Sequence, residues 1–409
     1  MSAVRVYLNT FDLNGAYSGF QEITDDTDVS TLTKVSQKLD NNAYDVGVFK
    51  NTNINIKLRN DHGKFSEVGV DQSLFVEKRI DSIVKVTWNA NEVDELICGV
   101  AVCGEAVLAE DVNVFYGLLN DVATSQNIRD QKISFSCQGL ESVFNRVETN
   151  FGSLNGADNI SDIIYDLLNQ TAITDLMTVS AGNISVGQDQ VPDSIAELEE
   201  TTVKEALDLL LEASNSVVYV DVTDQTVYVK PRTAAASVSH TFYGQASDNG
   251  SESIVNIQNV RTGLNRTFNF WKWKDTTTTA KDTTSITNYG VRKKELDNDL
   301  LTNTTKRSNL LTDYKDEFKD PKQELTLTGI LDYDTIQLFL LDRVNIDYPT
   351  VFEPAQGSDL PIYGVAVYGQ DKYPLGQWNL TIDTTTNYKI LGRSVDLKNN
   401  LITFTLREI

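Results

Sequence analysis

Three cysteines and two histidines are the residues of this chain best suited to nucleophilic, redox or metal chemistry. Cys98, Cys103 and Cys137 each lie within an apolar alternating stretch, and their spacing matches no redox or metal motif. Neither His62 nor His240 has a cysteine or another histidine nearby in sequence. We therefore expect buried, reduced thiols and no cofactor or metal.

Acidic residues could serve two other kinds of site. The clusters Asp25–Asp28 and Asp297–Asp299 do not have the spacing that gathers oxygen ligands around calcium, so we interpret them as solvated turns. Two carboxylates could hydrolyse a glycosidic bond, but no pattern distinguishes any two of the 58 acidic residues. Phosphate-binding glycine loops, zinc-protease helices and serine-hydrolase elbows are also missing. The sequence predicts a protein that is not an enzyme.

The net charge is −23, from 58 acidic and 35 basic residues. Such a surface repels the phosphate backbone, which argues against sequence-specific nucleic-acid binding. Charge of this sign keeps a protein soluble, and it also suits the wall of a conduit through which nucleic acid slides. No stretch approaches the roughly 18 apolar residues of a membrane span, and the N-terminus lacks a signal peptide's apolar region. We expect a soluble protein that is made without export.

A nine-residue phrase occurs twice, and six of its nine positions are identical between Ile97–Glu105 and Ile362–Gln370. Three flanking elements recur in the same order. First, Val84, Val86 and Trp88 align with Val344, Ile346 and Tyr348. Next, Tyr116-Gly117 aligns with Leu391-Gly392, and last, Ile133–Ser136 aligns with Ile402–Thr405. Four matches in one order predict two copies of one β module in a single chain. Cys98, Cys103 and Cys137 align with Tyr363, Tyr368 and Leu406, so the module does not require sulfur.

The periodicity divides the 409 residues into four regions. Residues 1–148 alternate with period two and predict a first antiparallel β-barrel module. Residues 149–236 carry two apolar stripes at helical spacing, Ile160–Leu168 and, after a capping box of Thr202 and Glu205, Val203–Leu211. A hairpin follows, which predicts an α+β domain. Residues 237–324 predict a strand-rich, partly helical connecting region, and residues 325–409 a second β-barrel module. The fold class is mainly β with an α+β insert.

Two tryptophans stand on one face of a predicted strand in the connecting region. Trp271 and Trp273 point to one side, whereas Phe268 and Phe270 point to the other, so both faces carry large rings. Core packing is the favoured interpretation. Contact with another protomer is the alternative, and it is the one interface we assign from the sequence.

This order of regions resembles the baseplate or tail-tip hub proteins of tailed bacteriophages. The resemblance also includes Tyr289–Arg292, the strand Asp342–Pro349 and the closing Leu406–Glu408. The family carries two tail-tube-like β-barrel domains per chain. The resemblance implies a homotrimer whose six barrels match a six-fold tail tube, while the other domains present three-fold symmetry to a spike or fibre. DNA would leave through the lumen.

The resemblance also implies partners and a location. The tail tube or distal tail protein would bind on one side and a spike or fibre protein on the other, with the tape measure protein as a further candidate. The protein would lie in the virion, at the tail tip or baseplate, after assembly in the host cytoplasm. The family transfers no catalytic residue to this chain.

Two other functions stay open from the residues. A carbohydrate- or cell-surface-binding β protein of the tail would use Trp271, Trp273 and Trp378 as stacking platforms. A cell-wall hydrolase would need a site that no motif reveals. Neither alternative explains the internal repeat.

Overall fold

The structure is a computed structural model of the 409-residue chain. It describes residues 4–11, 17–28, 32, 34–39, 46–51, 53–60, 65, 81–89, 111–127, 130–233, 235–244, 253–347 and 385–409. Both copies of the repeated phrase, residues 97–105 and 362–370, lie outside the described residues. So do His62, Cys98, Cys103, Tyr363, Tyr368 and Trp378.

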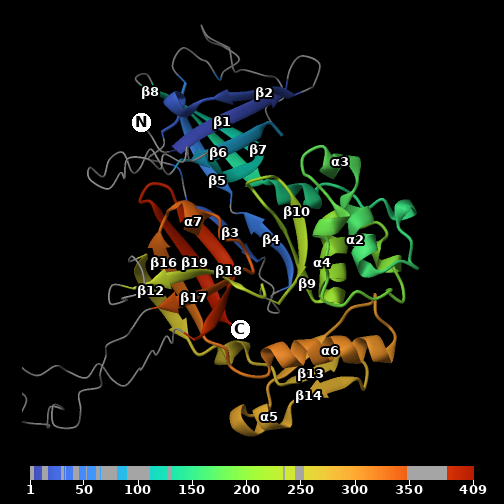
Figure 1. The fold of residues 1–409 in the computed structure, drawn as a ribbon. Coiled ribbons are helices and arrows are strands. Elements are labelled where there is room, and N and C mark those ends of the chain that lie inside the picture. The colour runs from blue at the N-terminus through green and yellow to red at the C-terminus, as the bar shows by residue number, and fades with distance from the viewer. Residues whose placement is uncertain are drawn as a thin grey trace, which may run out of the picture.

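A six-stranded antiparallel sheet forms the upper part of the molecule in Figure 1, with the order β2-β1-β6-β7-β8-β5. Its strands are β1 (Val4–Phe11), β2 (Tyr17–Glu22), β5 (Ile54–Arg59), β6 (Ile83–Trp88), β7 (Val112–Asn127) and β8 (Asp130–Gly139). One face of β5 is buried at every second residue, which is the period-two pattern of its sequence.

A ten-stranded sheet contains the C-terminal strands. Its main path is β10-β9-β4-β3-β18-β19-β16-β12, and β17 joins β18 to β11. The strands are β3 (Val35–Leu39), β4 (Gly47–Asn51), β9 (Ser216–Val220), β10 (Val227–Pro231), β11 (Val238–Tyr243), β12 (Ile254–Arg261), β16 (Glu324–Ile330), β17 (Arg343–Asp347), β18 (Asn387–Asp396) and β19 (Leu401–Glu408). The strands β3 and β4 thus connect the C-terminal strands to the α+β hairpin β9-β10.

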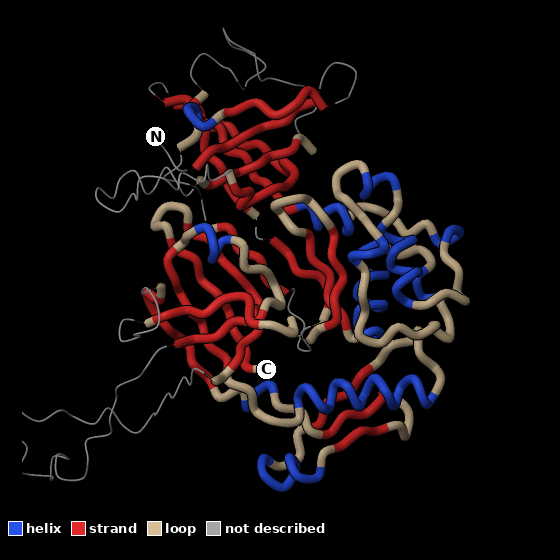
Figure 2. Tube along the Cα trace, viewed as in Figure 1, coloured by secondary structure: helices blue, strands red, loops and turns tan. Residues whose placement is uncertain are grey.

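Helices gather beside this hairpin, as Figure 2 shows. They are α2 (Ile160–Leu168), α3 (Thr171–Thr174) and α4 (Val203–Ser214). The stripe of α2 is fully buried, and each such Ile or Leu side chain stabilises the fold by about 1.5–3 kcal/mol. Thr202 and Glu205 form a capping box at the start of α4, and Asn215 ends the helix with a left-handed backbone (φ 57°).

A three-stranded sheet with two helices lies below (Figure 1). The strands are β13 (Phe270–Trp273), β14 (Thr279–Lys281) and β15 (Lys293–Leu296), in the order β14-β13-β15, with α5 (Thr283–Tyr289) and α6 (Thr304–Phe318). The short helix α7 (Tyr333–Ile336) lies between β16 and β17. None of the described helices is long and apolar enough to cross a membrane. The fold is mainly β, as the alternating pattern predicts.

Candidate assembly site

Four consecutive strands occur twice with the same arrangement. The first set is β5 to β8, in the order β6-β7-β8-β5, and the second is β16 to β19, in the order β17-β18-β19-β16. We call these sets unit one and unit two. All three pairings within each unit are antiparallel, and in each the strand that comes first along the chain lies beside the last.

The two units also share their register. Buried residues of the first strand face buried residues of the last strand. These pairs are Ile54 with Cys137 and Ile56 with Phe135 in unit one, and Leu325 with Leu406 and Leu327 with Phe404 in unit two. Phe135 and Phe404 therefore hold equivalent places, and Cys137 is equivalent to a leucine. Cys137 is buried, and burial raises the pKa of its thiol.

A bulge occurs at the same place in each unit. The pairing of β7 with β8 shifts between Leu119 and Asp121, and the pairing of β18 with β19 shifts between Ile390 and Gly392. Because Leu119 faces Cys137 and Ile390 faces Leu406, the two shifts follow equivalent residues. Bulges bend a strand and are specific features of a fold, so their coincidence strengthens the equivalence.

The strands β6 and β17 follow residues with the same rare backbone. Asp81 has φ 71° and Leu341 has φ 67°, a left-handed conformation that few non-glycine residues adopt. The N–H of Asp81 donates to the carbonyl of Leu119, and the N–H of Leu341 donates to that of Ile390, each at 2.9 Å. The chain therefore enters the second strand of both units in the same way.

One sequence match is displaced from the structural one. Tyr116-Gly117 resembles Leu391-Gly392 in sequence, but Gly117 pairs with Gly139, whereas Gly392 pairs with Thr405. The register makes Gly117 equivalent to Tyr388, four residues earlier on β18. The match at Ile133–Ser136 and Ile402–Thr405 does agree with the register.

Two neighbouring rows on the outer face of unit two are polar and nearly free of charge, whereas the next row on that face is charged and consists of Arg261, Glu324, Arg407, Lys389 and Arg343. Residues paired across antiparallel strands share one face, so the pairings trace rows of side chains across it. One row is Asn256, Thr328, Thr403, Ser394 and Ser36, and the next is Gln258, Thr326, Thr405, Gly392 and Lys38. Thr328 and Thr403 lie 3.1 Å apart through their hydroxyl oxygens. Two shorter rows cross unit one, namely Asn55, Ser136 and Asp121, and Lys57, Ser134 and Ala123.

Charged side chains attach α6 to unit two. Glu317 accepts from Lys389 (Nζ to Oε1 2.8 Å) and pairs with Lys322. Burial alone would raise the pKa of Glu317, but Lys389, Arg232 and Lys322 hold it well below its usual range. The guanidinium groups of Arg232 and Arg407 lie 4.8 Å and 4.6 Å from the centre of the Phe318 ring.

A second buried cation lies inside unit two, beside Phe339, whose ring centre is 5.2 Å from that of Tyr219 on β9. Arg393 donates through Nη1 to the carbonyls of Ile336 (3.1 Å) and Leu338 (3.0 Å), and its guanidinium lies 4.3 Å from the centre of the Phe339 ring. Burial lowers its pKa to about 10, opposed by Asp221 and Asp342. The sequence analysis did not assign a role to Lys389, Arg393 and Arg407. A charged residue inside an apolar strand is nevertheless a signal of a buried polar contact.

The two tryptophans of β13 lie in this chain's own core. Trp271 is 0% exposed and Trp273 is 2% exposed. Trp271 packs between Tyr314 and Phe318 of α6, and its Nε1 donates to the carbonyl of Phe268 (2.8 Å). A ring that stacks on a sugar needs an exposed face, so these two do not form that platform. Their contact with another protomer stays a prediction.

The remaining reactive side chains do not gather. His240 on β11 lies against Phe242, and burial lowers its pKa, opposed by Asp332 and Asp334. In the part of the chain that the structure describes, no three His, Cys, Asp or Glu side chains are placed to hold a metal ion.

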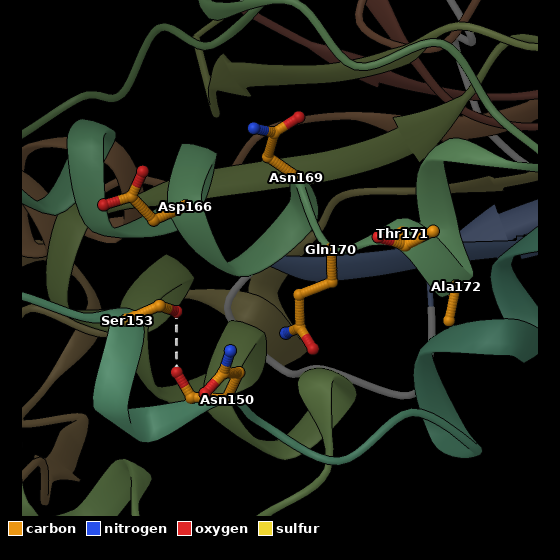
Figure 3. A pocket seen from close by; sticks show the side chains of 7 residues that line it. All are labelled: Asn150, Ser153, Asp166, Asn169, Gln170, Thr171 and Ala172. Carbon is orange, nitrogen blue, oxygen red and sulfur yellow. Dashed lines mark hydrogen bonds between the residues drawn. The ribbon is translucent and has the colours of Figure 1, made fainter.

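A polar pocket lies beside α2 and α3 (Figure 3). Its lining residues are Asn150, Ser153, Asp166, Asn169, Gln170, Thr171 and Ala172. The Ser153 hydroxyl donates to the Asn150 carbonyl at 2.7 Å. Burial raises the pKa of Asp166, helped by Asp158 and Asp162. The Ser153 hydroxyl is engaged in the bond to Asn150 and the lining residues include no cation, so we assign the pocket no chemistry.

Solved structures of phage tail proteins share this fold. A tail protein from Neisseria meningitidis is 12% identical with a TM-score of 0.52, and the match covers 99% of this chain and 95% of that one. The 43 kDa tail protein of a Shewanella oneidensis prophage is also 12% identical with a TM-score of 0.52, covering 98% and 97%. A prophage tail protein from Listeria monocytogenes is 11% identical with a TM-score of 0.50, covering 99% and 94%.

Sequence comparison alone finds no relative. No protein-family model matches the chain, and no curated protein sequence matches it significantly. At 11–12% identity the likeness to tail proteins is one of fold, and it extends over nearly the whole chain.

Proposed function

We propose that this chain is a structural protein of a phage tail tip or baseplate hub, and that three copies form a ring around a lumen. The observation that carries the proposal is the repeated unit, with its common strand order, register, bulge and left-handed entry residue. Each unit would belong to one tail-tube-like β-barrel module, in residues 1–148 and 325–409. Two modules per chain provide six in a trimer, so a three-fold assembly matches a six-fold tube.

The two intervening regions would provide the three-fold binding sites of the assembly. Residues 149–236 and 237–324 would present three-fold sites to a spike or fibre, while the ring binds the tail tube or distal tail protein, with the tape measure protein as a further partner. Two contacts support this arrangement, because the Glu317–Lys389 ion pair joins residues 237–324 to unit two and the ring contact of Tyr219 with Phe339 joins residues 149–236 to residues 325–409. The protein would act at the tail tip of the virion after assembly in the host cytoplasm.

The polar rows suggest which surface lines the lumen. The two rows across unit two contain ten residues, of which only Lys38 is charged. Hydroxyl and amide groups hydrate well and carry no fixed charge to hold a phosphate, so DNA would pass without binding. The role is structural, and cell-wall cleavage would belong to another subunit.

The mass of the purified protein in solution tests the proposal. Three chains of 45.5 kDa would give about 137 kDa by light scattering after size exclusion. A species of 45.5 kDa at micromolar concentration, unchanged by adding tail-tube protein, would reject the ring.

A further inference from the structure

The two units differ in what lies beside their third strand. In unit two, the stretch Gly392–Val395 of β18 pairs with β19 on one side and with β3 on the other. The equivalent stretch of β7 is Asp121–Thr124, and it pairs with β8. Within the described ranges, no strand pairs with its other side.

The left-handed residue Asp81 lies where the pairing of β6 with β7 ends. The pairing of β6 with β7 ends at Leu118, and the last backbone bonds join Leu119 to Asp81 and Ser82. Leu341 makes the equivalent bond to Ile390 before β17, and there β3 lies beside β18.

This edge of β7, which has no strand partner within the described residues, carries a hydrogen bond to its own side chain. The backbone N–H of Val122 donates to the carboxylate of Asp121 (N to Oδ1 2.8 Å), and Asp121 is exposed. This bond satisfies an N–H that would otherwise donate to a carbonyl of a neighbouring strand. A charged residue at an edge also discourages unspecific strand pairing.

We propose that the Asp121–Thr124 edge of β7 receives a strand from a second copy of this chain, as β18 receives β3. This inference rests on the proposed ring. In a ring where the two units alternate, the β18 edge of unit two is already paired with β3 of its own chain. The β7 edge of unit one would then face the next copy. Main-chain hydrogen bonds to an added strand would then close the ring.

The substitution Val122→Pro tests this edge. It removes the N–H that the Asp121 carboxylate accepts, and proline is tolerated at a strand edge. The control is Val122→Ile, which keeps the donor. We expect about 137 kDa for the wild type and the control, and 45.5 kDa for Val122→Pro, with unchanged circular dichroism.

Each alternative outcome overturns a defined statement. A trimeric, folded Val122→Pro variant overturns the edge contact but leaves the ring. A monomeric wild type overturns the ring and the edge contact together. If Val122→Pro does not fold, hydrogen exchange of the wild-type trimer decides, because peptides covering 119–127 should exchange at least about tenfold more slowly than in diluted monomer. Equal exchange rates would contradict the contact.

Discussion

The carboxylate of Glu317 on α6 accepts a hydrogen bond from the ammonium of Lys389 on β18 at 2.8 Å, and Lys389 is only 2% exposed. Removing one partner of a buried ion pair leaves the other charge unbalanced. Glu317→Gln should therefore lower the free energy of unfolding by about 3 kcal/mol at pH 7. Urea denaturation measures this change. A loss below about 0.5 kcal/mol, the range of an exposed pair, would contradict a buried joint.

The same substitution has a defined pH dependence. The folded-state pKa of Glu317 is depressed, so its contribution to stability is present above its ordinary pKa and is lost as the pH falls through the folded value. The difference between wild type and Glu317→Gln should shrink as the pH is lowered from 7 towards 3. A constant difference would show that packing, not charge, is responsible.

Glu212 on α4 should behave in the opposite way. Burial raises its pKa to about 7, opposed by a hydrogen bond from Asn298 and helped by Asp297 and Asp208. A raised acid pKa stabilises the fold below the ordinary value, and this contribution is lost as the pH rises through 7. Glu212→Gln should stabilise the protein at pH 8 by on the order of 1 kcal/mol and change little at pH 4.5. Thermal melts at the two pH values test the sign.

Gly117 on β7 lies too close to the next strand for a side chain. A Cβ there would lie 2.1 Å from the carbonyl oxygen of Gln138, whereas at Gly152 the nearest atom would be 3.9 Å away. Gly117→Ala should cost about 2 kcal/mol, and Gly152→Ala should be nearly neutral. Equal unfolding midpoints for the two variants would contradict the close approach of β7 and β8.

Charge placed on the polar rows of unit two should create affinity for DNA. Thr326 and Thr405 are paired on that face, and lysine at both positions would provide two phosphate contacts per chain. We expect the double variant to bind duplex DNA with a salt slope that exceeds the wild-type slope by about 0.9 for each added contact. Fluorescence anisotropy at several salt concentrations measures it. If the wild-type protein already binds duplex DNA as tightly as the double variant, the polar rows do not form a lumen wall that lets DNA pass without binding.

Local patterns predicted the local elements. The stripe from Ile160 to Leu168 and the capping box at Thr202 specify α2 and α4, because the 3.6-residue period and the cap depend on neighbours in sequence. Alternation likewise predicted β5 and β19.

The long-range strand pairing and the burial of charged side chains could not be predicted from the sequence. The period of β19 assigns Arg407 to its polar face, yet Arg407 is 1% exposed because Phe318 covers it. The position of β3 beside β18 joins residues more than three hundred apart and leaves no periodic signal. The displaced match at Gly117 has a similar cause, since pairing and the bulge decide equivalence, not residue identity.

An electron-microscopy image of the purified assembly, viewed down its axis, tests the central claim most directly. The account predicts six similar density lobes around an open centre, contributed by three chains. Three lobes, or a filled centre, would contradict it.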